Sequence, residues 1–202
     1  MQERDEKARA ALIAYFSQNG LLLCNENARM PFLEIAGGNW NAIVSLMESG
    51  DVFYSRLYQH RVTYLSRSFY YLMKPYRQRE HRLDAPCVRL LAFLRAAGEA
   101  NAEQMQTACL LEKKAQGKAL EQLVSELLVT VSRRDKTIHD SWCTFYYCPA
   151  ERWEEKQTPP TNEQIERAHE WLHHSFTQKQ IQSLLSHPEH SNMETSIATT
   201  KI

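Results

Sequence analysis

Two short segments of the chain share one pattern of apolar and polar positions. ALIAYFSQNG occupies residues 11–20, and RLLAFLRAAG occupies residues 89–98. In both, apolar residues recur at the spacing of an amphipathic helix and a glycine closes the segment. The pattern predicts helices that end near Gly20 and Gly98, and it indicates an internal repeat.

A second pair of segments extends the repeat. NAIVSLMESGDVFYSRL at 41–57 aligns with KALEQLVSELLVTVSRR at 118–134, and each predicts a helix that runs into a β-strand. A second strand and a short middle helix complete each copy. These strands are predicted at 61–65 and 142–147, and the middle helices at 33–36 and 102–109. Each copy thus reads helix, short helix, helix, strand, turn, strand.

This order predicts the winged variant of the helix-turn-helix, twice in tandem. The expected fold class is mainly α, of the α+β type: two winged-helix units with β-hairpin wings and a C-terminal helical tail. The predicted boundaries are unit 1 at 4–74, a linker at 75–84, unit 2 at 85–156, a C-terminal helical segment at 161–186 and a disordered tail at 187–202. A single α+β domain with similar helix ends is the alternative.

Composition narrows the function classes. Lys plus Arg and Asp plus Glu are both 24, so net charge does not favour nucleic acid, and DNA binding has to rest on local clusters. The charged start MQERDEKARA is unlike a signal peptide, and no apolar stretch is long enough for a membrane span. Five scattered cysteines indicate reduced, mostly buried thiols. We therefore expect a cytoplasmic protein that has no membrane contact and no cofactor.

Basic residues gather where a winged helix contacts DNA, at the start of the recognition helix and in the wing. We predict double-stranded DNA as the partner. The predicted DNA-binding residues are Arg56, Tyr58 and Arg61 in unit 1, Lys113, Lys114 and Lys118 on the unit 2 helix, and Arg133, Arg134 and Lys136 in its wing. In the first unit, Asn39 and Asn41 could read adenine edges, although asparagines at a helix start are usually caps.

The competing class is a protein-interaction module built on winged helices. A protein partner or a homodimer would then dock on an aromatic surface around Tyr70, Tyr71 and Trp153. Ordinary solvated faces of small domains also carry clustered charge, so the basic residues alone do not separate these two classes.

One motif fits a zinc hydrolase. His169-Glu170-Trp171-Leu172-His173 matches H-E-x-x-H, in which the two histidines share a helix face and the glutamate acts as general base. The apolar stripe beside it is explained by packing, and a third ligand would have to come from the region of His187 and His190. We expect no metal site, with His169 and His173 as the candidates if one exists.

Three stretches together resemble a known family: VFYSRLYQHRVTYLS, LVTVSRR followed by WCTFYYCPAERWEE, and ERAHEWLHHSF followed by QKQIQSLL. They resemble bacterial winged-helix proteins related to the AlkZ-like DNA glycosylases, over most of residues 8–186. The resemblance implies tandem winged helices and a nucleic-acid context. Full-length members have three winged-helix units, so this chain resembles a reduced relative.

The family's catalytic signature is a glutamine–apolar–glutamine (or aspartate) triplet. Gln104-Met105-Gln106 and Gln180-Ile181-Gln182 fit it in form, although such triplets are common by chance. We assign no catalytic residue and expect a DNA-binding, regulator-like or DNA-repair-associated accessory factor rather than an enzyme. A glycosylase-like enzyme is the alternative that the resemblance implies.

Overall fold

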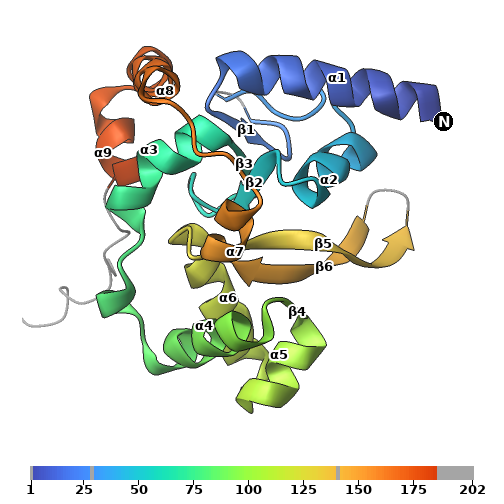
Figure 1. The fold of residues 1–202 in the computed structure, drawn as a ribbon, viewed down its shortest axis with the longest axis vertical. Coiled ribbons are helices and arrows are strands. Elements are labelled where there is room, and N and C mark those ends of the chain that lie inside the picture. The colour runs from blue at the N-terminus through green and yellow to red at the C-terminus, as the bar shows by residue number, and fades with distance from the viewer. Residues whose placement is uncertain (1, 28–29, 140–141, 186–202) are drawn as a thin grey trace, which may run out of the picture.

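The computed structural model describes residues 2–27, 30–139 and 142–185, and it folds the chain as a mixed α+β protein (Figure 1). The predicted disordered tail at 187–202 lies outside the described residues. No helix in the described ranges is long and apolar enough to cross a membrane.

The described residues of the first half of the chain, 2–77, form three helices and one small sheet. Its elements are α1 (Gln2–Gln18), β1 (Leu21–Leu23), α2 (Trp40–Glu48), β2 (Val52–Ser55), β3 (Thr63–Ser66) and α3 (Arg67–Arg77). The antiparallel sheet has the order β1-β3-β2, with Tyr54 opposite Tyr64. β1 was not predicted, and it turns the expected hairpin into a three-stranded sheet.

The second half, residues 80–155, repeats this arrangement. A 3₁₀ turn (Glu80–Arg82) leads into α4 (Ala85–Ala97), β4 (Ala100–Asn101), α5 (Ala102–Cys109), α6 (Lys113–Ser125), β5 (Val129–His139), β6 (Trp142–Pro149) and α7 (Ala150–Glu155). The sheet order is β4-β6-β5, again first, third, second. The element order predicted from the repeat is therefore present in this half.

The first half departs from the prediction at residues 33–36, which form a turn and not a helix. The turn closes at Gly37, whose φ of 74° lies in the left-handed region that glycine adopts without strain. Leu33 is buried while Glu34 and Ile35 are exposed, so this stretch presents too little apolar surface to stabilise a helix.

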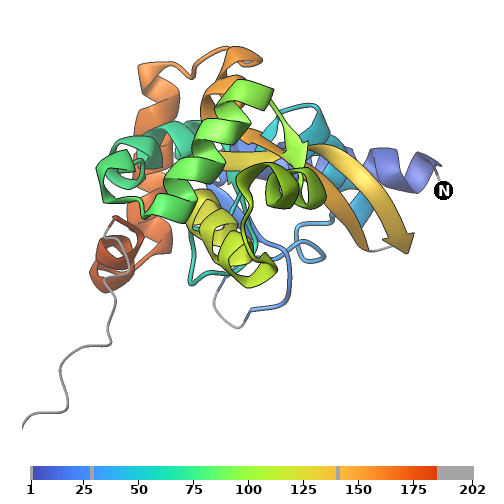
Figure 2. The ribbon, with the colours of Figure 1, turned by 90° about the horizontal axis from the view of Figure 1, so that it is seen from below.

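Two helices follow the second half, α8 (Asn162–Ser175) and α9 (Gln178–Leu185). They return to the first half and pack on α3, on the side of the molecule opposite the N-terminal end of α1 and the tip of the β5–β6 hairpin (Figures 1 and 2). Thr161 caps α8 with a capping box. Trp171 lies against Phe69 and donates a hydrogen bond to Asn19, which ties α8 to the end of α1.

The core has two parts, on opposite faces of the first sheet. One contains Leu12, Ile43 and Tyr64 together with Leu90 and Val131, so it runs through both halves. The other contains Phe53, Tyr70 and Trp153 with the apolar face of α8 and α9. All five cysteines are free, and four of them are buried.

Candidate nucleic-acid interface and the cleft between the two halves

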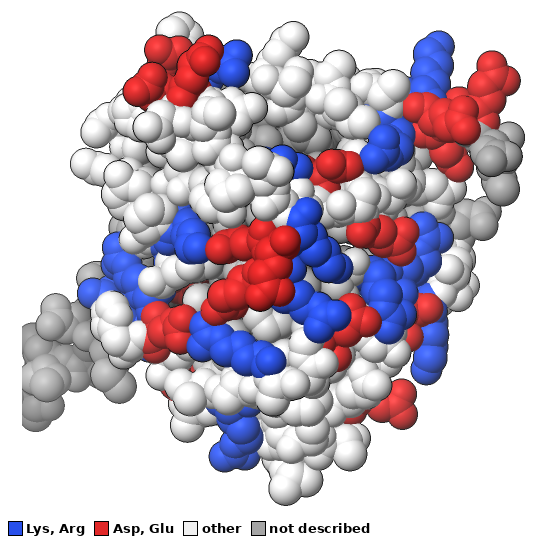
Figure 3. All heavy atoms as spheres, in the orientation of Figure 1, with Lys and Arg blue, Asp and Glu red and all other residues white. Residues whose placement is uncertain are grey.

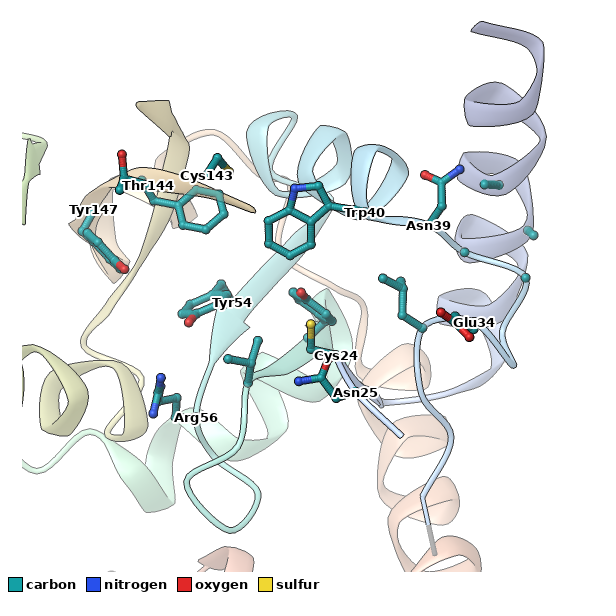
Figure 4. Close-up of a pocket in the computed structure, with 18 of the residues that line it drawn as sticks. Cys24, Asn25, Glu34, Asn39, Trp40, Tyr54, Arg56, Cys143, Thr144 and Tyr147 are labelled. Atoms are coloured by element: carbon teal, nitrogen blue, oxygen red, sulfur yellow. The ribbon is translucent and has the colours of Figure 1, made fainter. Parts of the chain in front are cut away.

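A large cleft lies between the first and second halves, with a volume of about 1260 Å³. The first half contributes one side of α1, the segment after β1, the start of α2 and strands β2 and β3. The second half contributes β6 and the edge of α5 and α6. Figure 4 shows Trp40 in the middle of this space, with Thr144 and Tyr147 of β6 on one side and Asn39 and Glu34 on the other.

The walls of the cleft are mainly aromatic. Trp40, at the first turn of α2, lies 6.2 Å from the ring of Phe145, and Phe145 lies 6.3 Å from Tyr54. Tyr64 and Tyr147 complete the lining. Trp40 and Phe145 are only half-buried, so each leaves part of its ring accessible from the cleft. Partly exposed aromatic faces of this kind are stacking surfaces for planar ligands.

Polar groups at the base of the cleft are already partnered. The Cys24 thiol and the Tyr64 hydroxyl share a hydrogen bond, and burial raises the pKa of both groups. Tyr54 is hydrogen-bonded to Arg56, whose guanidinium donates to Glu121 Oε1 at 3.1 Å. Cys24 is consequently a neutral thiol at neutral pH, and the base of the cleft offers hydroxyl groups rather than a nucleophile.

The mouth of the cleft carries charge. Arg4 and Lys7 line it from α1, and both are exposed. Among the described residues no carboxylate lies within 4.0 Å of either cation. Glu34 and Asn25 face the same space from the segments that follow β1. The mouth of the cleft therefore has two cations without an acidic partner among the described residues, one carboxylate and one amide, and its interior is aromatic.

The asparagines at the start of α2 are structural. Asn39 is the N-cap, accepting from the Ala42 backbone N–H at 2.9 Å and donating to Asp5. Asn41 also donates to Asp5. Packing covers α2 itself on both sides, because it contacts α1 and β5 and most of its residues are buried. This helix therefore has no free face of the kind that enters a DNA groove.

In contrast, α6 presents a free basic face. Lys113, Lys114 and Lys118 are all exposed, and within the described ranges none of them lies within 4.0 Å of a carboxylate. Gly117 lies between them, and a Cβ added there would meet no atom within 4 Å. The opposite side of α6 packs on α4, α5 and β5.

The predicted wing cations are present on the β5–β6 hairpin, but each has an acidic neighbour. Arg133 donates to Glu99 at 2.7 Å and lies over the Tyr146 ring. The next two pairs are longer. Arg134 is 4.0 Å from Glu48, and Lys136 is 3.8 Å from Glu103. Figure 3 shows basic and acidic side chains interleaved across this face of the molecule, so acidic neighbours on other elements offset much of the positive charge of the hairpin.

The predicted residues of the first half fall into different environments. Arg61 is exposed in the turn between β2 and β3, whereas Arg56 points into the cleft and pairs with Glu121. Tyr58 is 3% exposed and packs on Phe176, so its ring is not at the surface. Its predicted contact with DNA is wrong in this conformation, because the turn after α8 covers it.

The aromatic docking surface predicted around Tyr70 and Trp153 is also wrong. Tyr70 is 0% exposed and Trp153 is 2% exposed, and both pack on Phe53. Lys74 pairs with Glu154 at 2.7 Å beside them. These rings are part of the core that joins α3 to α7, and only Tyr71 remains partly accessible.

Neither glutamine triplet lies at the cleft. The Gln104 side chain accepts from the Asn101 backbone N–H in a capping box, and Met105 is buried. In the second triplet, Gln180 accepts from the backbone N–H of Thr177, and Ile181 is buried. Each triplet therefore caps a helix with its first residue and packs with its second.

The two histidines of the H-E-x-x-H motif do meet on α8. His169 and His173 have their Nε2 atoms 3.2 Å apart, and both side chains are exposed. Within the described residues no group of three or more metal-ligating side chains is close enough to hold a metal ion. The proposed third ligands, His187 and His190, lie outside the described residues.

The exposed cations of α6 could be predicted from the sequence, whereas the cleft could not. Its walls come from segments around residues 24, 40, 54 and 145, which are far apart in the chain. The one signal in the sequence is the aromatic content of the predicted strands at 61–65 and 142–147.

Comparison with known proteins supports the resemblance noted in the sequence. No curated protein and no solved structure matches the chain. The model of one family, described as AlkZ related, matches residues 33–193. Because this match covers most of the sequence, including the whole second half, the chain belongs to the AlkZ-related family.

Proposed function

We propose that the protein binds double-stranded DNA through its second half and acts as a DNA-repair-associated accessory factor. The observation that carries this proposal is the exposed face of α6, where Lys113, Lys114 and Lys118 have no acidic partner among the described residues. Unpaired lysines on one helix face can neutralise phosphates without first breaking an ion pair.

The topology of the second half supports this interpretation. The order helix, strand, helix, helix, hairpin, with the first strand on the hairpin's second strand, is that of a winged-helix unit. In such a unit, α6 would be the recognition helix and the β5–β6 hairpin the wing. The first half has the same strand order, so we interpret it as a second unit that lacks the middle helix.

Gly117 adds an independent argument. Glycine in a helix interior costs about 1 kcal/mol relative to alanine, and no neighbouring atom in the described structure requires it here. A glycine between Lys114 and Lys118 leaves the helix surface flat, so a DNA backbone or base edge can approach α6 closely.

The other predicted contacts take lesser roles. Arg133, Arg134 and Lys136 on the wing would have to exchange an acidic neighbour for a phosphate, so we expect each to contribute less than a lysine of α6. Arg61 remains an exposed candidate in the first half. Because α2 is packed against α1 and β5, we expect the first half to support the second half and not to contact DNA bases itself.

The proposal is tested by fluorescence anisotropy with a random-sequence duplex over a salt series. We expect the logarithm of the association constant to fall with the logarithm of salt at about 0.9 per neutralised phosphate. The triple variant Lys113→Ala/Lys114→Ala/Lys118→Ala should weaken binding at low salt and lower the slope by about 2 to 3.

A matched control removes the same charge elsewhere. Arg82, Arg167 and Lys179 are exposed and none of them lies on α6 or on the β5–β6 hairpin, so their triple alanine variant should keep the wild-type affinity and slope within about half of one phosphate contact. If the two triple variants lose the same affinity, DNA binding depends only on the net charge of the protein and not on the α6 surface. Absence of duplex binding by the wild-type protein at low salt would end the proposal.

A further inference from the structure

The cleft has no role in duplex binding as proposed above, yet it borders both of the elements used there. Leu120 on α6 lines the cleft, and it lies two residues after Lys118. Thr144 and Phe145 line it from the wing strand β6. The cleft and the proposed duplex-binding surface are thus formed partly by the same two elements.

The interior of the cleft suits a flat aromatic group. Trp40 and Phe145 come from opposite halves of the molecule, their ring centres are 6.2 Å apart, and the planes are tilted by 51°. Tyr54 continues the wall behind Phe145. A base that enters beside Trp40 would exchange stacking on its neighbours in DNA for stacking on protein rings, and every base has a π face that can make this exchange.

The mouth suits the sugar–phosphate of the same nucleotide. Arg4 and Lys7 lie one helical turn apart on the cleft side of α1 and are free of acidic partners in the described structure. Asn25 offers an amide that can both donate to and accept from a base edge. Glu34 lies beside α1 on the same side of the cleft (Figure 4), so it opposes a phosphate there and lowers the net positive charge that Arg4 and Lys7 give to the mouth.

We propose that the cleft binds an unpaired nucleotide of a DNA strand, with its base against Trp40 and Phe145 and its phosphate at Arg4 and Lys7. The cleft is larger than one base requires, at about 1260 Å³, so adjacent sugar and phosphate enter as well. This inference rests on the proposed function for the source of the strand.

Two DNA probes test the site separately from duplex binding. The first is a short single strand that contains 2-aminopurine, and the second is a duplex with one unpaired 2-aminopurine. We expect the wild-type protein to quench the fluorescence of both probes by stacking, and to bind the second probe about tenfold more tightly than the fully paired duplex. Free deoxynucleoside monophosphate should bind far more weakly, because the neighbouring phosphates are missing.

Substitutions distinguish the contribution of the aromatic walls of the cleft from that of the cations at its mouth. Trp40→Ala and Phe145→Ala should each remove the quenching and about tenfold of the affinity for the unpaired probe, while fully paired duplex binding is kept. Trp40→Phe should retain most of the effect. Arg4→Ala/Lys7→Ala should weaken binding and keep the quenching at saturation. Tyr76→Ala, an exposed ring outside the cleft, is the control.

Cys24 provides a second readout in the wild-type protein. Its sulfur faces the cleft (Figure 4), so the short strand should slow the alkylation of Cys24 by iodoacetamide at alkaline pH, where part of the thiol is ionised. This measurement needs no substitution in a wall residue.

The outcomes distinguish the two proposals. Equal affinity for paired and unpaired probes, or a preference that survives both Trp40→Ala and Phe145→Ala, would overturn the cleft assignment while leaving duplex binding intact. A free nucleotide that binds as tightly as the strand would overturn the assignment to DNA. Single-strand binding that depends on Trp40, in a protein that does not bind duplex, would support the cleft and contradict the role of α6.

Discussion

At the scale of single residues, two glycines show how one residue type serves opposite purposes. Gly20 lies between α1 and β1, where an added Cβ would be 2.4 Å from Phe69 and 2.6 Å from Trp171. Gly117 lies inside α6, where an added Cβ would touch nothing within 4 Å. Packing of α8 against the first half requires the first glycine, whereas no contact in the described structure requires the second.

Alanine substitutions at these glycines should therefore shift stability in opposite directions. Gly20→Ala forces rigid rings apart and should lower the free energy of unfolding by about 1 to 3 kcal/mol. Gly117→Ala should raise it by about 0.5 to 1 kcal/mol, because alanine favours the helix. Urea denaturation measures both changes.

If DNA approaches α6 closely, Gly117→Ala also weakens duplex binding although it stabilises the fold. A stabilised variant with unchanged affinity would show that Gly117 is not needed for DNA to approach α6.

At the scale of elements, one hydroxyl joins the two sheets. Tyr54 lies on β2, the edge strand of the first sheet, and its backbone N–H and C=O point away from β3. Thr130 Oγ1 of β5 accepts from that N–H and donates to that C=O, both at 3.0 Å. The edge of β2 is therefore satisfied by a side chain of the second sheet, which also fixes the wall of the cleft at Tyr54.

Thr130→Val should lower the free energy of unfolding by about 1 to 3 kcal/mol, because valine fills the same space and leaves two buried backbone groups unpaired. Thr130→Ser keeps the hydroxyl and should lose less than half of that amount. Denaturant midpoints of the three proteins decide between these expectations. Equal stability of the valine and serine variants would show that water or a shifted strand satisfies Tyr54 instead.

The elements that could be predicted from the sequence are those whose signal is local. Helical periodicity is a local property, so the helices before Gly20 and Gly98 were predicted correctly. β1 and β4 span only Leu21–Leu23 and Ala100–Asn101, too short to show a period. Local patterns also carry no information about cover by distant segments, which is why Tyr58 was placed at the surface and the cleft was missed.

The position of a short motif in the tertiary structure also decides what its residues do. The glutamine triplets match a catalytic signature in form, but Gln104 and Gln180 sit at helix starts, where a side-chain oxygen satisfies a free backbone N–H. A short motif cannot distinguish a cap from a catalytic group. The residues of the cleft, in contrast, form no motif at all, since they meet only when the two halves fold together.

At the scale of the whole molecule, the halves are joined more closely than two tandem units on a linker. One core contains Leu12 and Tyr64 of the first half together with Leu90 and Val131 of the second. Arg77 on α3 is 3% exposed and donates to the carbonyl oxygens of Ser125 at 3.0 Å and Leu184 at 3.3 Å. This side chain links the first half to the end of α6 and to α9.

The described chain should therefore unfold in a single cooperative transition. A shared core means that neither half can lose its structure without exposing apolar surface of the other, so calorimetric and van't Hoff enthalpies should agree. Arg77→Met should lower the melting temperature of that one transition, because two buried carbonyl groups lose their donor at a cost of about 1 to 3 kcal/mol.

Two resolved transitions in the wild-type protein would show that the halves are independent units. The cleft between them would then vary in width and would not be a formed site. A single transition, with the Trp40 and Phe145 variants melting close to the wild-type temperature, would mean that the aromatic walls are held in place before any DNA arrives.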